Sequence, residues 1–178
     1  MNGNIRNAML VLRIKNGEAE LTKELIVNNY DRVYKYIRFK TGDEHLSYDL
    51  TQEVFIRLIN ALEDYREQTY FNAFLMKIAR NALADHFRSR REEVSLDEAE
   101  YIIPADVFED VLSRKDAVRR ALMRLPAEQR DAVLLKFVSG LKSREIAEIT
   151  NVNVSTVKSR IHRGKEKLKI LLKEEGIV

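Results

Sequence analysis

The segment from Leu141 to Leu172, LKSREIAEITNVNVSTVKSRIHRGKEKLKILL, predicts two helices joined by a tight turn. Ser143 is placed to cap the first helix, because its hydroxyl can accept a hydrogen bond from an unpaired backbone N–H. Asn151 and Asn153 bracket the turn, and Asn tolerates the left-handed backbone that a turn often needs. The segment therefore predicts a helix-turn-helix.

The second helix of this pair has one apolar face and one polar face. Val154, Val157, Ile161 and Leu168 recur at helical spacing on the apolar face. The polar face begins with short side chains and continues with cations: Ser155, Thr156, Lys158, Ser159, Arg160, His162, Arg163, Lys165, Lys167 and Lys169. Short polar residues can approach base edges, while Lys and Arg reach guanine or phosphate. The pattern favours a helix that enters the DNA major groove, although a solvated charged face is the simpler alternative.

Composition favours an all-α protein. The chain has 178 residues, enough for one medium domain or two small ones, and only six Gly and two Pro. It has no Cys, which excludes disulfides, thiolate nucleophiles and Cys-ligated metals. The net charge of +3 is too small to indicate nucleic acid by itself. No apolar run approaches the length of a membrane span and the N-terminus is too polar for a signal peptide, so we expect a cytoplasmic protein.

Apolar stripes predict three helices in the first half of the chain. They run from Glu18 to Lys40, with Gly42 as the stop, from Asp49 to Tyr65, and from Phe71 to Arg91. Whether residues 1–16 form a docked helix is left open by the sequence. In the third helix we expect these residues to face inward: Phe71, Phe74, Leu75, Ile78, Ala82 and Phe87. Its outer face is the second basic surface of the chain: Lys77, Arg80, Asn81, Asp85, Arg88, Arg90 and Arg91.

The loop between the second and third helices, YREQTY, has an aromatic residue at each end. Aromatic residues at a loop edge are usually part of the core. They also stack unpaired bases, at about 1–3 kcal/mol per base.

The segment from Glu92 to Asp110 is acidic, contains no Lys or Arg, and loses the helical stripe. It predicts a flexible linker between two helical domains, 1–91 and 111–178. After it we expect a helix over 111–125, and another over 127–138 with Pro126 in its first turn. In the latter, Val133, Leu134 and Phe137 should face inward and Lys136 outward.

Two stretches together resemble one protein family. Residues 125–169, LPAEQRDAVLLKFVSGLKSREIAEITNVNVSTVKSRIHRGKEKLK, resemble region 4 of bacterial sigma-70 family sigma factors. Residues 49–91, which contain DLTQEVFIRLINAL and FNAFLMKIARNALADHFRSRR, are similar to region 2. In this order, with an acidic linker between them, they resemble the extracytoplasmic-function (ECF, group IV) RNA polymerase sigma factors.

The resemblance implies an all-α protein of two domains, a region 2 bundle and a region 4 helix-turn-helix, that directs core RNA polymerase to promoters and helps to melt the DNA. Together with the basic surfaces above, it predicts −35 element contacts at Lys136, Ser155, Thr156, Lys158, Ser159, Arg160, His162, Arg163 and Lys165. It predicts −10 element contacts at Arg66, Tyr70, Lys77, Arg80, Asn81 and Arg88. It predicts polymerase contacts at Asp49, Gln52, Glu53 and Phe55.

The resemblance also implies regulation by an anti-sigma factor, often membrane-bound, and a linker that passes through the polymerase near the RNA path. Two alternatives remain open: a stand-alone helix-turn-helix regulator that binds DNA without polymerase, and a helical adaptor with incidental basic faces. An enzyme is not expected. The three His residues, His45, His86 and His162, lack metal-ligand spacing and no Gly-rich phosphate loop is present. We therefore expect no catalytic residue, metal, cofactor or small-molecule substrate.

Overall fold

The structure is a computed structural model that describes residues 3–66, 70–93 and 114–177. Every regular element in these ranges is a helix, which confirms the predicted all-α class. The chain divides into two compact units, residues 1–101 and 102–178. The predicted acidic linker, 92–110, falls outside the described residues except for its first two positions, which extend the helix before it.

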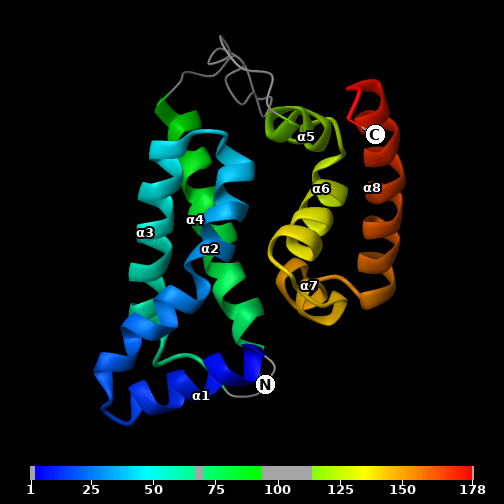
Figure 1. The fold of residues 1–178 in the computed structure, drawn as a ribbon. Coiled ribbons are helices and arrows are strands. Elements are labelled where there is room, and N and C mark those ends of the chain that lie inside the picture. Colours follow the sequence, from blue (N-terminus) through cyan, green and yellow to red (C-terminus); the bar gives the residue numbers. More distant parts are fainter. Residues whose placement is uncertain (1–2, 67–69, 94–113, 178) are drawn as a thin grey trace. The chain divides into compact units, whose positions relative to one another are not determined.

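The first unit is a helical bundle. Its elements are α1 (Gly3–Lys15), the 3₁₀ turn η1 (Ala19–Leu21), α2 (Thr22–Thr41), α3 (Glu44–Ala61) and α4 (Phe71–Glu93). Helices α2, α3 and α4 pack on one another, and α1 lies across one end of them (Figure 1). Leu25, Val33, Leu58 and Phe71 are fully buried between them. The undecided N-terminal segment is therefore a docked helix, with Leu10 and Val11 buried.

Caps explain where the helices of this unit begin and end. Gly42 ends α2 as predicted, with φ of +73° and its N–H bonded to the Arg38 carbonyl. Helix α3 begins at Glu44, earlier than the predicted Asp49, because the Asp43 side chain accepts a 2.9 Å hydrogen bond from the Leu46 N–H. The N-cap signal lay outside the apolar stripe from which we predicted the helix.

Helix α4 follows the predicted inner face only in part. Phe71, Leu75 and Ala82 are buried as expected. Phe74, Ile78 and Phe87 are partly exposed, so the buried stripe is narrower than the apolar one.

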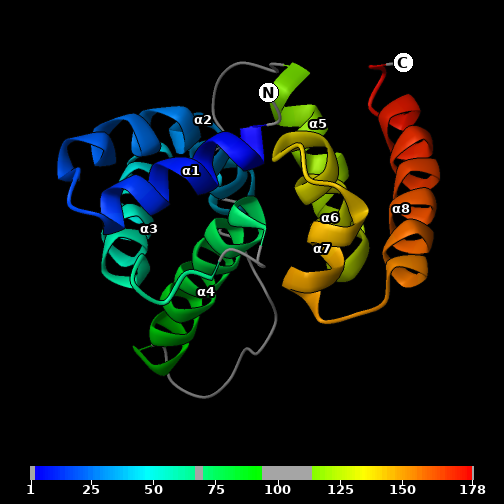
Figure 2. The ribbon, with the colours of Figure 1, turned by 90° about the horizontal axis from the view of Figure 1, so that it is seen from below.

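The second unit contains the helix-turn-helix. Its elements are α5 (Arg114–Met123), α6 (Ala127–Val133), the π-helix η2 (Leu134–Val138), α7 (Ser143–Thr150) and α8 (Val154–Glu174). Helix α8 packs along α6 and also contacts α5 and α7 (Figure 2). The fully buried Leu134, Leu135, Leu141 and Ile146 form its core.

The π-helix overturns one prediction about the second unit. Val133 and Leu134 are buried as expected, but Phe137 is 59% exposed. The Ser139 N–H bonds to the Leu134 carbonyl, five residues back, at 3.0 Å. This wider turn changes the side-chain register that α-helical spacing assumes, and Leu135 is buried in place of Phe137.

The turn before α8 forms as predicted, while the cap of α7 does not. Asn151 has a left-handed φ of +53°, and Asn153 is the N-cap of α8. Ser143, predicted to cap α7, is instead its first residue. The N-cap residue is Lys142, and the Glu145 carboxylate accepts a hydrogen bond from the Lys142 N–H at 2.6 Å. A carboxylate at this position suits the positive end of a helix.

Candidate nucleic-acid interfaces

Helix α8 is held against α6 by a close approach at Gly164. A Cβ added to Gly164 would lie 2.8 Å from Val133 Cγ2 and 3.3 Å from both the Gln129 Cβ and the Gln129 carbonyl oxygen. Val157 and Leu171 are buried on the same side of α8. Because Gly164 has no side chain, α8 approaches Val133 and Gln129 of α6 closely here. This contact sets the rotation of α8 about its axis and turns its polar face to solvent.

The first turn of α8 is ordered by its cap. The Asn153 side-chain oxygen accepts hydrogen bonds from the Thr156 N–H at 2.7 Å and from the Ser155 hydroxyl at 2.6 Å. The helix therefore begins at a defined point, with its positive end and short polar side chains together. This combination suits the approach of a phosphate or a base edge.

The predicted −35 residues share one surface but differ in exposure. These residues are exposed on α8: Ser155, Lys158, Ser159, His162, Arg163 and Lys165. Thr156 is partly exposed. Arg160 is only 21% exposed and forms a 2.6 Å ion pair with Glu128. Lys136, on η2, is also partly buried and donates to the Leu141 carbonyl at 3.3 Å.

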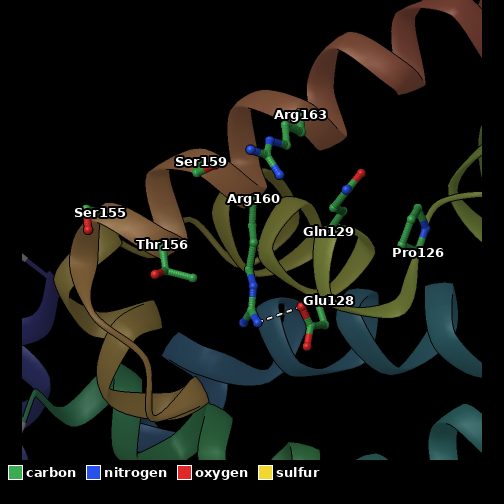
Figure 3. Close-up of a pocket in the computed structure, with 8 residues that line it drawn as sticks. All are labelled: Pro126, Glu128, Gln129, Ser155, Thr156, Ser159, Arg160 and Arg163. Atoms are coloured by element: carbon green, nitrogen blue, oxygen red, sulfur yellow. Dashed lines mark hydrogen bonds and ion pairs between the residues drawn. The ribbon is translucent and has the colours of Figure 1, made fainter.

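A cleft of about 450 Å³ separates the start of α6 from the first half of α8. Figure 3 shows Arg160 reaching across it to Glu128. The lining residues are Pro126, Glu128, Gln129, Ser155, Thr156, Ser159, Arg160 and Arg163. Glu128 and Gly164 were not among the residues predicted from the sequence. The sequence does contain a signal for Gly164, because a glycine inside a helical pattern indicates a packing or functional reason for its small size.

The predicted −10 residues lie on α4 and beside its start. Lys77, Asn81 and Arg88 are exposed, and Arg80 is partly exposed. Arg88 has a 3.6 Å ion pair with Asp85. The remaining two, Arg66 and Tyr70, are exposed on either side of residues 67–69, which lie outside the described residues.

Of the two loop-edge aromatics, Tyr65 belongs to the core. It is 5% exposed, and its ring centroid lies 5.8 Å from that of Phe71 and 5.3 Å from that of Phe74. Tyr70 is 41% exposed. Of these two rings, only that of Tyr70 is therefore accessible to a base.

Helix α3 carries the predicted polymerase residues. Asp49 and Gln52 are exposed, whereas Glu53 is partly buried. Phe55 is 4% exposed, and its ring is stacked on Tyr30 at 6.0 Å, so it supports this surface from beneath. Burial raises the pKa of the Tyr30 hydroxyl.

An ion-pair network fixes the Glu53 carboxylate. Arg57 bonds to Glu53 at 2.5 Å and to Asp85 on α4 at 2.6 Å. The pKa of Arg57 is raised, chiefly because its guanidinium donates a hydrogen bond to Asp85. The same helix also exposes three apolar residues that were not predicted from the sequence: Tyr48, Ile56 and Ile59. Exposed apolar and acidic side chains together favour a protein partner over DNA.

Two kinds of feature are absent from the described part of the chain. Residues 3–66, 70–93 and 114–177 contain no group of three or more His, Cys, Asp or Glu arranged to hold a metal ion. None of the helices described in those ranges has the length and apolar content needed to cross a bilayer.

Both units match known protein families. Residues 25–93 match the family model "Sigma-70 region 2", and residues 115–168 match "Sigma-70, region 4". The chain is 27% identical over 179 residues to the ECF RNA polymerase sigma factor SigW of Bacillus subtilis, covering 92% of this chain and 95% of SigW. It is 30% identical over 138 residues to the ECF RNA polymerase sigma factor EcfG of Rhodopseudomonas palustris, covering 76% of each.

A solved structure has the same fold. It is the co-crystal structure of the sigma factor RpoE in complex with the anti-sigma factor NepR from Bartonella quintana. The TM-score is 0.68 at 25% identity, and the match covers 85% of this chain and 96% of that one.

Proposed function

Since the chain belongs to the extracytoplasmic-function RNA polymerase sigma factors, we propose that it binds core RNA polymerase, brings it to promoters and helps to open the DNA. The observation that carries this function is the presence of both sigma regions, in order, in one chain. We propose that the protein acts in the cytoplasm, without catalytic activity or a cofactor.

The second unit, for which we propose residues 111–178, binds the −35 element. The supporting observation is the close contact at Gly164, which turns the polar face of α8 outward. The proposed contacts are Lys136, Ser155, Thr156, Lys158, Ser159, Arg160, His162, Arg163 and Lys165. The exposed Arg163 and Lys158 are placed to reach bases or phosphates. Arg160 must share its guanidinium with Glu128.

The first unit, for which we propose residues 1–91, binds the −10 element in its melted form. The proposed contacts are Arg66, Tyr70, Lys77, Arg80, Asn81 and Arg88. Extruding a base costs a few kcal/mol. Stacking on an exposed aromatic returns about 1–3 kcal/mol. The exposure of Tyr70 beside the cations of α4 supports this assignment.

Core polymerase binds α3 through Asp49, Gln52 and Glu53, above the buried Phe55. The exposed Ile56 and Ile59 support a protein interface here, because they provide apolar area beside the acidic residues. The linker, residues 92–110, passes through the polymerase near the RNA path, where its negative charge resembles that of a nucleic acid strand.

The protein is also controlled by an anti-sigma factor that covers the two basic units. Support comes from the RpoE co-crystal structure, whose partner is the anti-sigma factor NepR.

Reconstituted transcription tests the proposal. Core polymerase with and without the full chain is given a genomic library, and start sites are mapped. We expect new start sites that share −35 and −10 elements and appear only with the protein. Free-DNA binding should be weak and salt-sensitive, because phosphate contacts dominate it. Tight, specific binding to a palindrome without polymerase, and no new start sites, would favour the stand-alone regulator.

A further inference from the structure

Helix α1 contacts both ends of the segment that joins α3 to α4. On the α3 side, the Lys15 ammonium donates to the carbonyls of Glu63 at 2.9 Å and Tyr65 at 3.4 Å. On the α4 side, the Asn4 side-chain oxygen accepts the Asn72 N–H at 3.0 Å. Asn4 and Lys15 lie at opposite ends of α1. One helix therefore binds both ends of one segment.

Both contacts satisfy backbone groups that helix termini leave unpaired. The Asn72 N–H lies in the first turn of α4, where no intrahelical acceptor exists, so Asn4 acts as a cap supplied from a distant helix. The Glu63 and Tyr65 carbonyls follow the end of α3, and a Lys ammonium is a favourable donor there. The rise between Asn4 and Lys15 is about 17 Å, a span that a helix keeps constant.

Buried side chains hold α1 itself in place. Leu10 and Val11 are buried, and the Asn7 side chain donates to the Asn29 side-chain oxygen at 2.9 Å in the interior. Arg32 then donates to both Asn29 and Asn72. A satisfied buried polar network makes a specific, rigid contact, because each group would be costly to leave unpaired. Helices α1, α2 and the start of α4 therefore form one rigid support.

Two residues between the two contacts, Arg66 and Tyr70, are proposed to meet DNA. Arg66 follows the buried Tyr65 directly, and Tyr70 precedes the buried Phe71. The Tyr70 carbonyl accepts the Phe74 N–H at 3.0 Å, which ties it to α4. Each exposed side chain is thus within two residues of a backbone group that α1 binds.

We propose that α1 is a positioning element for the −10 element, holding Arg66 and Tyr70 where an extruded promoter base is bound. This rests on the −10 assignment made under the proposed function. Preformed contacts matter because the energy of base extrusion is recovered only by groups already in place. If α1 no longer holds this segment, Arg66 and Tyr70 must become ordered when DNA binds, and the conformational entropy that they lose then weakens binding.

Two substitutions remove the two contacts separately. Asn4→Ala deletes the acceptor for the Asn72 N–H, and Lys15→Met deletes the ammonium while keeping the aliphatic stem. Arg6→Gln is the matched control, because it breaks the 2.7 Å ion pair between Arg6 and Glu24, which joins α1 to α2 and involves neither end of the segment that joins α3 to α4. Hydrogen exchange of the free full-length variants confirms that they fold. Because each variant removes a different contact, the effect of each contact on −10 recognition is measured separately.

The measurement is the ratio of initiation by reconstituted holoenzyme on two templates. One carries a promoter selected from the genomic library, and the other has substituted −10 base pairs with the same −35 element. We expect each contact variant to lower this ratio by at least about two- to tenfold, because Asn4→Ala loses one hydrogen bond and Lys15→Met loses two. Arg6→Gln should leave it unchanged. A purely structural role would reduce initiation on both templates equally and leave the ratio unaltered, which overturns the proposal.

Tyr70→Ala, measured in parallel, separates this inference from the −10 assignment. If Tyr70→Ala lowers the ratio while Asn4→Ala and Lys15→Met do not, α1 has no positioning role and the −10 assignment stands. If Tyr70→Ala also leaves the ratio unchanged, the −10 assignment is wrong and the role of α1 goes with it.

Discussion

Replacing Gly164 with Ala tests whether α8 is held by its contact with α6. In a free helix this change is favourable by about 1 kcal/mol, because Ala has the higher helix propensity. Here the new Cβ would lie 2.8 Å from Val133 Cγ2, whereas two carbons prefer about 3.5–4.0 Å. The contact and the propensity therefore act in opposite directions.

The contact should outweigh the propensity. Val133 is 4% exposed, and a β-branched side chain in a helix has essentially one rotamer, so its methyl group cannot swing aside. The Gln129 carbonyl, at 3.3 Å, is backbone. Overpacking of this kind costs about 1–3 kcal/mol. After subtraction of the propensity gain, we expect a net destabilisation of about 1 kcal/mol in the α6–α8 contact.

Hydrogen exchange read by mass spectrometry on the full chain is the suitable assay. A chain of two units need not unfold in one step, so a local measurement is required. Protection of α6 and α8 peptides should fall by about fivefold, which corresponds to 1 kcal/mol. The control is Gly164→Ala in a Val133→Ala background, where Cγ2 is absent and the substitution should no longer cost protection.

A rise in α8 protection caused by Gly164→Ala alone would contradict this expectation. That result would mean that helix propensity acts unopposed and that the two helices are not in close contact. The contact at Gly164 would then no longer explain why the polar face of α8 turns to solvent.

Three further outcomes are expected. Replacing Arg163 with Ala should weaken initiation by about 1–3 kcal/mol on a matched −35 element if it contacts a base edge, and by less if it meets only phosphate; no loss on any template removes it from the interface. Glu53→Lys should reduce core polymerase binding in a pull-down while helix content by circular dichroism stays constant, with Asp31→Lys on α2 as control; unchanged affinity contradicts the assignment. The pKa of the Glu24 carboxyl is lowered because Arg6 donates a hydrogen bond to it. This ion pair therefore stabilises the folded protein above the pKa that Glu24 has in the unfolded chain, and the stabilisation is lost as the pH falls through the pKa of Glu24 in the folded protein. An NMR titration of Glu24 with an ordinary midpoint would refute this.

Local signals explain most of what could be predicted about the fold. The helices, the stop at Gly42 and the turn between Asn151 and Asn153 follow from spacing and caps over a few residues. The errors arose where one local rule was overridden by another. Asp43 began α3 ahead of its apolar stripe, and the π-helix turned Phe137 outward.

The candidate site was predictable as a set of residue types on helix faces. It was not predictable as a set of contacts. Arg160 looks like the other cations of α8, yet its partner is Glu128, on another helix. The family resemblance predicts Phe55 as a polymerase contact, yet its side chain is buried against Tyr30.

The sequence by itself determined the all-α class, the two helical units and the basic face of α8, because helical periodicity and capping act between residues three or four apart. Tertiary structure alone decided which way that face turns and what residues 3–15 do. The contact of Gly164 with Val133 and the bonds of Asn4 and Lys15 to α4 and the end of α3 join residues far apart in the chain. Such contacts leave no period in the sequence, since they depend on how helices pack.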